Sequence, residues 1–199
     1  MTTVTTGPSA DELAVPLAFT LPPRWEQLDP ATHGAPGSAM LALYEERGET
    51  FTPSITIGIQ RRTDGATLEQ VADEALARLA EVTDAVEVIS RDEVGSGHAP
   101  GITQTLLLVT SFGGVTQELV QSQVHIEVPL VPPTPGAVPA DRLAIELTGT
   151  CRRDQAGTIL RDFQAFVDSV HVEVRPDRPT DTAPTHTPPA GQPRGGTTP

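Results

Sequence analysis

A long alternating stretch in the middle of the chain predicts a β-hairpin. Residues 101–110 are rich in apolar and β-branched side chains, Gly113 and Gly114 interrupt the pattern, and residues 115–128 alternate polar with apolar. On the second arm the apolar side chains share one face, and they are Val120, Val124, Ile126 and Val128. An isolated hairpin is not stable in water, so we expect other elements to cover this apolar face.

Further apolar or alternating segments predict the remaining strands of an antiparallel sheet. They lie at residues 16–22, 24–28, 39–44, 53–61, 86–94 and 142–148. Residues 39–44 and 53–61 are separated by a short charged turn, so these two segments should pair as a second hairpin. Trp25, the only tryptophan, is interpreted as a core or edge residue rather than as a platform for a ligand.

Two segments with helical periodicity predict amphipathic helices. The first begins near Thr67, where Gln70 three residues later gives the spacing of a capping box. Its apolar stripe consists of Leu68, Val71, Ala72, Ala75, Leu76, Leu79 and Val82, and we expect this stripe to face the sheet. The second helix is expected to begin near Asp154 or Gln155, with Asp154 as its cap, and to end near Val170.

These elements together predict an α+β fold in which an antiparallel sheet of about six or seven strands is packed by two main helices. Residues 1–14 are polar and without period, so we expect a flexible N-terminal segment before a single domain at residues 15–172. Seven of the 20 prolines lie in the last 29 residues, among few apolar side chains. Residues 173–199 are therefore predicted to be a disordered tail rich in Pro, Thr and Gly.

The charge of the chain excludes two classes of partner. The formal net charge is −13, and about 21 acidic residues stand against 10 basic ones outside the end segments. Such a surface repels phosphate backbones, so we expect neither a nucleic-acid partner nor binding to an anionic membrane. The N-terminus has no secretory pattern and no apolar run is long enough to span a membrane, which predicts a cytoplasmic protein without membrane insertion.

The residues that most often carry chemistry do not form a recognisable catalytic or metal-binding pattern. The five histidines are scattered, and no acidic pair lies on an apolar background, so we predict no metal, no cofactor and no enzymatic activity. Cys151 is interpreted as a small buried thiol and His125 as a solvated residue of a polar sheet face. The alternative is a hydrolase or small-molecule binder with a pocket near His125 and Cys151.

One polar feature of the predicted sheet is a candidate binding surface. Neutral amides recur on its strands together with threonines and one histidine, and the candidate partner-binding residues are Gln60, Gln104, Gln117, Gln121, Gln123 and His125. Such a face can hydrogen-bond to a bound peptide or helix at little desolvation cost. The alternative is an ordinary solvated sheet face without a partner.

The order of the elements resembles a known fold. The segment Phe19-Thr-Leu-Pro-Pro-Arg-Trp25, a strand pair, the helix at 67–82, the central hairpin and a closing helix through Phe163-Gln-Ala-Phe-Val-Asp-Ser-Val170 resemble the Mog1/PsbP-like fold. More narrowly, residues 16–172 look like the LpqN/DUF1795 group. The resemblance implies an antiparallel sheet between helices and a binding or assembly role. Some of these proteins are chaperones that cover apolar helices of exported proteins, and others are lipoproteins.

The sequence lacks the N-terminal lipidation cysteine of the lipoproteins, so we favour a cytosolic adaptor. The leading hypothesis is a non-enzymatic protein-binding module, a cytoplasmic chaperone or adaptor for a secreted or membrane protein that presents an apolar helix. A structural subunit of a larger assembly is the second hypothesis. The oligomeric state is left open.

Overall fold

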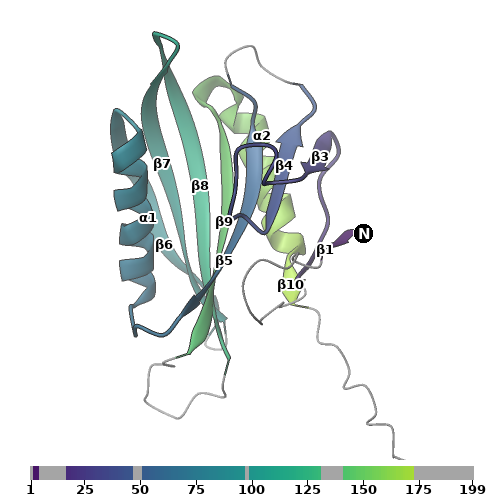
Figure 1. The fold of residues 1–199 in the computed structure, drawn as a ribbon, viewed down its shortest axis with the longest axis vertical. Helices are drawn as coiled ribbons and strands as arrows, with labels where there is room; N and C mark the ends of the chain where they lie inside the picture. The colour runs from purple at the N-terminus through teal and green to yellow at the C-terminus, as the bar shows by residue number, and fades with distance from the viewer. Residues whose placement is uncertain (1, 5–16, 47–50, 97–98, 131–140, 173–199) are drawn as a thin grey trace, which may run out of the picture.

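A seven-stranded antiparallel sheet forms the centre of the molecule (Figure 1). The computed structural model describes residues 2–4, 17–46, 51–96, 99–130 and 141–172. The strand order is β3-β4-β5-β9-β8-β7-β6, and every neighbouring pair is antiparallel. The strands are β3 (Trp25–Leu28), β4 (Met40–Tyr44), β5 (Ser54–Arg62), β6 (Ala85–Ser96), β7 (Ala99–Phe112), β8 (Val115–Pro129) and β9 (Arg142–Arg152).

Both predicted hairpins are confirmed. Strands β7 and β8 pair from Gly101 opposite Ile126 to Phe112 opposite Val115. Gly113 and Gly114 between them both have positive φ, at 58° and 82°, a conformation that residues with a side chain adopt at a cost. Strands β4 and β5 form the second hairpin.

The two helices lie on opposite faces of the sheet (Figure 1). Helix α1 (Leu68–Val82) packs against β6, β7 and β8, and α2 (Ala156–Ser169) packs on the other side, chiefly against β9. The predicted capping box is present, because the Thr67 hydroxyl accepts from the Gln70 amide and the Gln70 side chain accepts from the Thr67 amide. Val82 is 74% exposed, so the predicted apolar stripe ends one turn earlier.

The expected start of the second helix is wrong in one respect. A 3-10 turn, η1 (Arg153–Gln155), precedes α2, and the N-cap residue Gln155 makes no capping hydrogen bond with its side chain. Asp154 therefore does not cap the helix. Its carboxylate instead accepts hydrogen bonds from the Arg152 guanidinium, at 2.8 and 3.1 Å.

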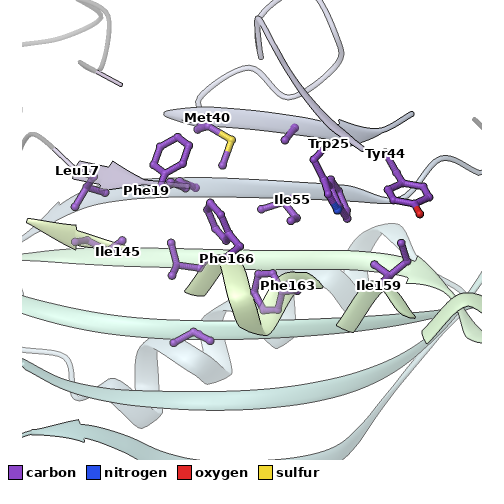
Figure 2. Packing of buried hydrophobic residues seen from close by; sticks show 14 of the residues in the cluster. Leu17, Phe19, Trp25, Met40, Tyr44, Ile55, Ile145, Ile159, Phe163 and Phe166 are labelled. Carbon is purple, nitrogen blue, oxygen red and sulfur yellow. The ribbon is translucent and has the colours of Figure 1, made fainter. Parts of the chain in front are cut away.

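The main hydrophobic core lies between the sheet and α2. Figure 2 shows the rings of Phe163 and Phe166 on the side of the sheet where Ile55 and Ile145 also point. Trp25 closes one end of this core, since its ring contacts Tyr44 edge to face at 5.3 Å and its indole N–H donates to Asp162 of α2 at 3.0 Å. Trp25 is 7% exposed, which confirms its interpretation as a core residue.

A second, three-stranded sheet that was not predicted extends this core. It consists of β1 (Thr2–Val4), β2 (Leu17–Phe19) and β10 (His171–Val172), with β2 in the centre. All three residues of β2 are buried, and the Phe19 ring contacts Phe166 edge to face at 5.4 Å. Residues 5–16 and 173–199 lie outside the described residues, so the flexible segment and the disordered tail stay predictions for those ranges.

Candidate functional site

The structure brings the predicted polar residues to one face of the sheet, the face that α1 occupies. Gln104 lies opposite Gln123 on the neighbouring strand, and His125 lies opposite Glu146 of β9. Gln60 of β5 lies opposite Ala144 of β9, which in turn lies opposite Glu127 of β8. Glu127 is two residues after His125 on the same strand, so Gln60 is on the same face as His125. The sequence pattern thus grouped these side chains correctly by face.

Most of these residues are not accessible from solvent. Gln104, Gln123 and His125 are between 0% and 2% exposed, and Gln121 is 9% exposed, whereas Gln60 is exposed and Gln117 is half-buried. The interpretation of His125 as a solvated residue is therefore wrong. The apolar side of α1 covers this face. Beneath it, Gln104 donates to Gln123 and to the Ala72 carbonyl, and Gln121 donates to Thr150. A partner role for all six residues stays a prediction.

A hydrogen-bonded chain of side chains runs under α1. The Arg91 guanidinium donates to Gln104 Oε1 at 2.9 Å, and Gln104 Nε2 donates to Gln123 Oε1 at 2.5 Å. Arg91 also pairs with Asp73 of α1 at 2.7 Å, which ties the helix to the edge strand β6. Arg91 is not among the predicted residues, because a β-bulge between Val88 and Ser90 shifts the alternation of β6 and turns Arg91 to the α1 face.

A hollow of about 290 Å³ lies next to α1, over the part of the sheet formed by β5 and β9. Its polar lining residues are Gln60, Arg62, Arg78, His125 and Glu146. Val71 of α1 and Ala144 of β9 add apolar surface. Here Gln60 and His125 of the predicted set meet three residues from outside it, and these are Arg62, Arg78 and Glu146.

The charges around the hollow are mutually balanced. Arg78 Nη2 lies 3.2 Å from Glu146 Oε2, and Arg62 makes ion pairs with Asp64 and Glu74 at 2.5 and 2.6 Å. The hydrogen bonds from Arg62 hold the pKa of both these carboxyls below the ordinary range. Burial lowers the pKa of His125, and this outweighs the opposing effect of the Glu146 carboxylate. His125 is therefore neutral at pH 7.

The alternative site that joins His125 to Cys151 is excluded by the fold. Cys151 is fully buried in the core on the α2 side, whereas His125 lies on the α1 side of the same sheet. Burial raises the pKa of the Cys151 thiol to about 11, so it is protonated and a poor nucleophile. This confirms the interpretation of Cys151 as a buried thiol. The described residues also contain no cluster of three or more side chains that could hold a metal ion.

A second candidate surface lies on the opposite side of β6 and β7, and we call it the open face. Its centre consists of Val94, Thr103, Thr105, Leu107 and Val109, and its rim consists of Glu87, Asp92 and Glu118. Helix α2 packs chiefly against β9 and β2, so this surface carries no helix within the part of the chain that the structure describes (Figure 1). No local pattern predicted this surface, since residues 106–109 are apolar on both faces.

The three rim carboxylates stand beside the apolar and hydroxyl-bearing residues of the centre. Glu87 lies opposite Leu107, Asp92 opposite Thr103, and Glu118 opposite Val109. Glu118 pairs with Arg153 at 2.8 Å. Val94 is 41% exposed, and the other centre residues are half-buried. The open face is thus a mildly apolar surface with an acidic border.

None of the helices in the described ranges is long and apolar enough to cross a membrane. No family model matches the sequence. No curated protein matches it either.

Comparison with solved structures identifies the fold. LpqN from Mycobacterium tuberculosis, described as involved in cell envelope biogenesis, matches with a TM-score of 0.54 and 12% identity over 78% of this chain and 82% of that chain. The Ran-binding protein Mog1p of Saccharomyces cerevisiae matches with a TM-score of 0.46 and 16% identity over 78% of this chain and 89% of that one. PsbP of Synechocystis matches with a TM-score of 0.48 and 13% identity over 84% and 98%.

At sequence identities this low, a structural match shows a shared fold and nothing about function. The match to LpqN, with its TM-score of 0.54, supports the fold assignment. Membership of the narrower DUF1795 group is not shown by these comparisons. The chain has the α+β, Mog1/PsbP-like fold that its sequence predicted.

Proposed function

We propose that this chain is a protein-binding module that holds an amphipathic helix with basic flanking residues on its open face. The observation that carries the proposal is the border of three carboxylates around a mildly apolar centre on β6, β7 and β8. An amphipathic helix with Lys or Arg at its flanks is complementary to such a surface in both polarity and charge.

The open face can contribute to binding in two ways. Covering Val94, Leu107 and Val109 removes apolar surface from water at about 25 cal/mol per Å². The rim charges remain partly solvated, so they contribute mainly to the association rate and to the choice of partner. Salt should therefore weaken the complex by screening the rim.

The cellular role that we propose is a cytoplasmic chaperone or adaptor. A helix that belongs to a secreted or membrane protein exposes its apolar side until it reaches its destination. A surface that covers this side and recognises basic flanks would keep such a helix soluble. The hypothesis derived from the sequence is retained in this form, with the surface moved from the amide-rich face to the open face.

The test is a comparison of two valine variants. Val94 in the open face is 41% exposed, and Val115 at the tip of the β7–β8 hairpin is 52% exposed, so Val94→Glu and Val115→Glu make the same change at sites of similar exposure. The probe is a synthetic amphipathic helix with leucines on one side and arginines at both ends. Its fluorescence anisotropy is measured with the full chain.

We expect Val94→Glu to weaken binding at least tenfold, about 1.4 kcal/mol, and Val115→Glu to leave it within twofold. Absence of binding by the wild type at about 1 mM, or equal losses in both variants, would overturn the proposal. Affinity purification from the native host then extends the test. A stoichiometric partner retained by wild type and Val115→Glu and lost with Val94→Glu would identify the natural helix.

A further inference from the structure

The hydrogen-bonded chain under α1 fixes which nitrogen of His125 carries its proton. Arg91 can only donate, so Gln104 Oε1 must face it, and Gln104 Nε2 must then face Gln123 Oε1. The His125 Nε2 atom lies 3.3 Å from the same Gln123 oxygen, which can only accept. His125 Nε2 therefore carries the hydrogen, and Nδ1 has a free lone pair.

This lone pair has no partner within the described structure. His125 is 1% exposed, and its Nδ1 atom is buried without a hydrogen bond. The ring is part of the wall of the hollow beside α1. A buried acceptor next to an open volume favours an occupant that can donate a hydrogen bond.

The other lining residues define the chemistry of this occupant. Glu146 is a second acceptor, Arg78 is a donor, and the Gln60 amide can do both. An anion would meet the Glu146 carboxylate, and a cation would meet Arg78 and Arg62. The ion pair between Arg78 and Glu146 balances the two charges, so neither sign of ligand is favoured. Hydroxyl groups, which donate and accept, satisfy both kinds of partner.

From this arrangement we infer that the hollow beside α1 binds a small neutral polyhydroxy compound, such as a monosaccharide or a cyclitol, through Glu146, Arg78 and Gln60. One hydroxyl of this compound reaches the buried His125 Nδ1 when the side chains that line the hollow move slightly. The hollow's volume of about 290 Å³ is many times the space that one water molecule requires, which leaves room for one sugar ring. Val71 and Ala144 face the carbon skeleton. This site is separate from the open face, and its test does not depend on the proposed protein partner.

The experiment is an NMR titration of the full chain labelled with ¹⁵N. The neutral probes are D-glucose and myo-inositol, and the charged probes are inorganic phosphate and ethanolamine. The resonances to follow are the Gly58 and Ala144 amides and the ring nitrogens of His125. Acceptance of a hydroxyl hydrogen should move the Nδ1 resonance upfield from the range of an unprotonated nitrogen, a signature that a purely structural His125 would not give.

We expect at least one neutral probe to give saturable shifts with a dissociation constant on the order of 1 mM or lower. Gln60→Ala removes an exposed lining side chain and should weaken this binding at least threefold. Gln27→Ala, at an exposed position of β3 outside the hollow, should leave it unchanged. Glu146→Gln keeps the shape of the residue, leaves Arg78 without its partner charge, and should shift preference from the neutral probe toward phosphate.

The absence of shifts with either neutral probe at about 50 mM would overturn the inference. Saturable shifts with phosphate or ethanolamine alone, or equal effects of Gln60→Ala and Gln27→Ala, would overturn it as well. The chemical-shift map also checks the location of the site. Shifts confined to β6 and β7 on the opposite side would point to another site and reject this one.

Discussion

Burial of His125 beneath α1 makes its protonation state a property of the fold. The ring is held by Gln123 and lies near Glu146, Arg78 and Arg91, which are the charged groups that act on its pKa. Desolvation has the largest effect and lowers this pKa below its ordinary value of 6.5. The unfolded chain therefore takes up a proton at a higher pH than the folded chain does.

This difference predicts a pH-dependent loss of stability. The contribution is fully present above pH 6.5 and is lost as the pH falls toward the lower folded pKa, at a rate of up to about 1.4 kcal/mol per pH unit. Urea unfolding of the wild type at pH 7.5 and 5.5 should show the loss, and His125→Gln should show less of it. His33→Gln, at an exposed loop position, should behave as the wild type. If His125→Gln lost as much stability between pH 7.5 and 5.5 as the wild type does, the pH dependence would not come from His125.

At the scale of elements, the contact between α2 and the sheet depends on one glycine. Strand β9 passes directly under the Phe163 ring at Gly149, where an added Cβ would lie 2.6 Å from the ring. Gly149 has no positive φ, so its requirement is the close approach and not the backbone conformation. Gly157 in the first turn of α2 has open space around it.

These two glycines give opposite predictions for the same substitution. Gly149→Ala should lower the free energy of unfolding by about 1–3 kcal/mol, because the Phe163 ring and α2 must move. Gly157→Ala should raise it by about 0.5–1 kcal/mol, because alanine has the higher helix propensity. Chemical denaturation of both variants measures the difference. A Gly149→Ala variant as stable as the wild type would show that α2 can shift without loss.

The element scale also explains which parts of the site were predictable. Strict alternation along β8 placed Gln121, Gln123 and His125 on one face, and the structure confirms this grouping. Alternation could not place Arg91, because the bulge in β6 adds a residue that no local pattern reveals. Nor could it find Arg78 in the hollow, since that contact joins α1 to a strand distant in sequence.

At the scale of the whole molecule, repulsion among acidic groups opposes folding. The formal net charge is −13, and several ion pairs in the described residues join two exposed side chains, such as Arg24 with Glu46 and Arg153 with Glu118. Exposed pairs contribute little to stability, whereas the summed repulsion favours expanded states. Added salt screens charges beyond about 10 Å at 0.1 M.

Salt should therefore stabilise the folded chain. We expect the Tm to rise by about 2–4 °C, near 1 kcal/mol, between low-salt buffer and moderate NaCl. A Glu87→Gln, Asp92→Asn variant should show a smaller rise, because it removes two exposed charges from one region of the surface. Calorimetry measures both. A Tm that falls with NaCl would mean that the ion pairs outweigh the repulsion.

The seven strands of the main sheet, the two helices and the two-sided character of these elements follow from local sequence patterns. Alternation, helical periodicity, the Gly113–Gly114 turn and the Thr67 capping box are local features, and they set local backbone preferences without reference to the rest of the chain. Which sheet surface stays accessible depends instead on how the elements pack against one another. Burial depends on the segment that packs above a strand. Helix α1 removed the amide-rich face from solvent except at the hollow, and α2, which packs against β9 and β2, left the open face on the other side uncovered.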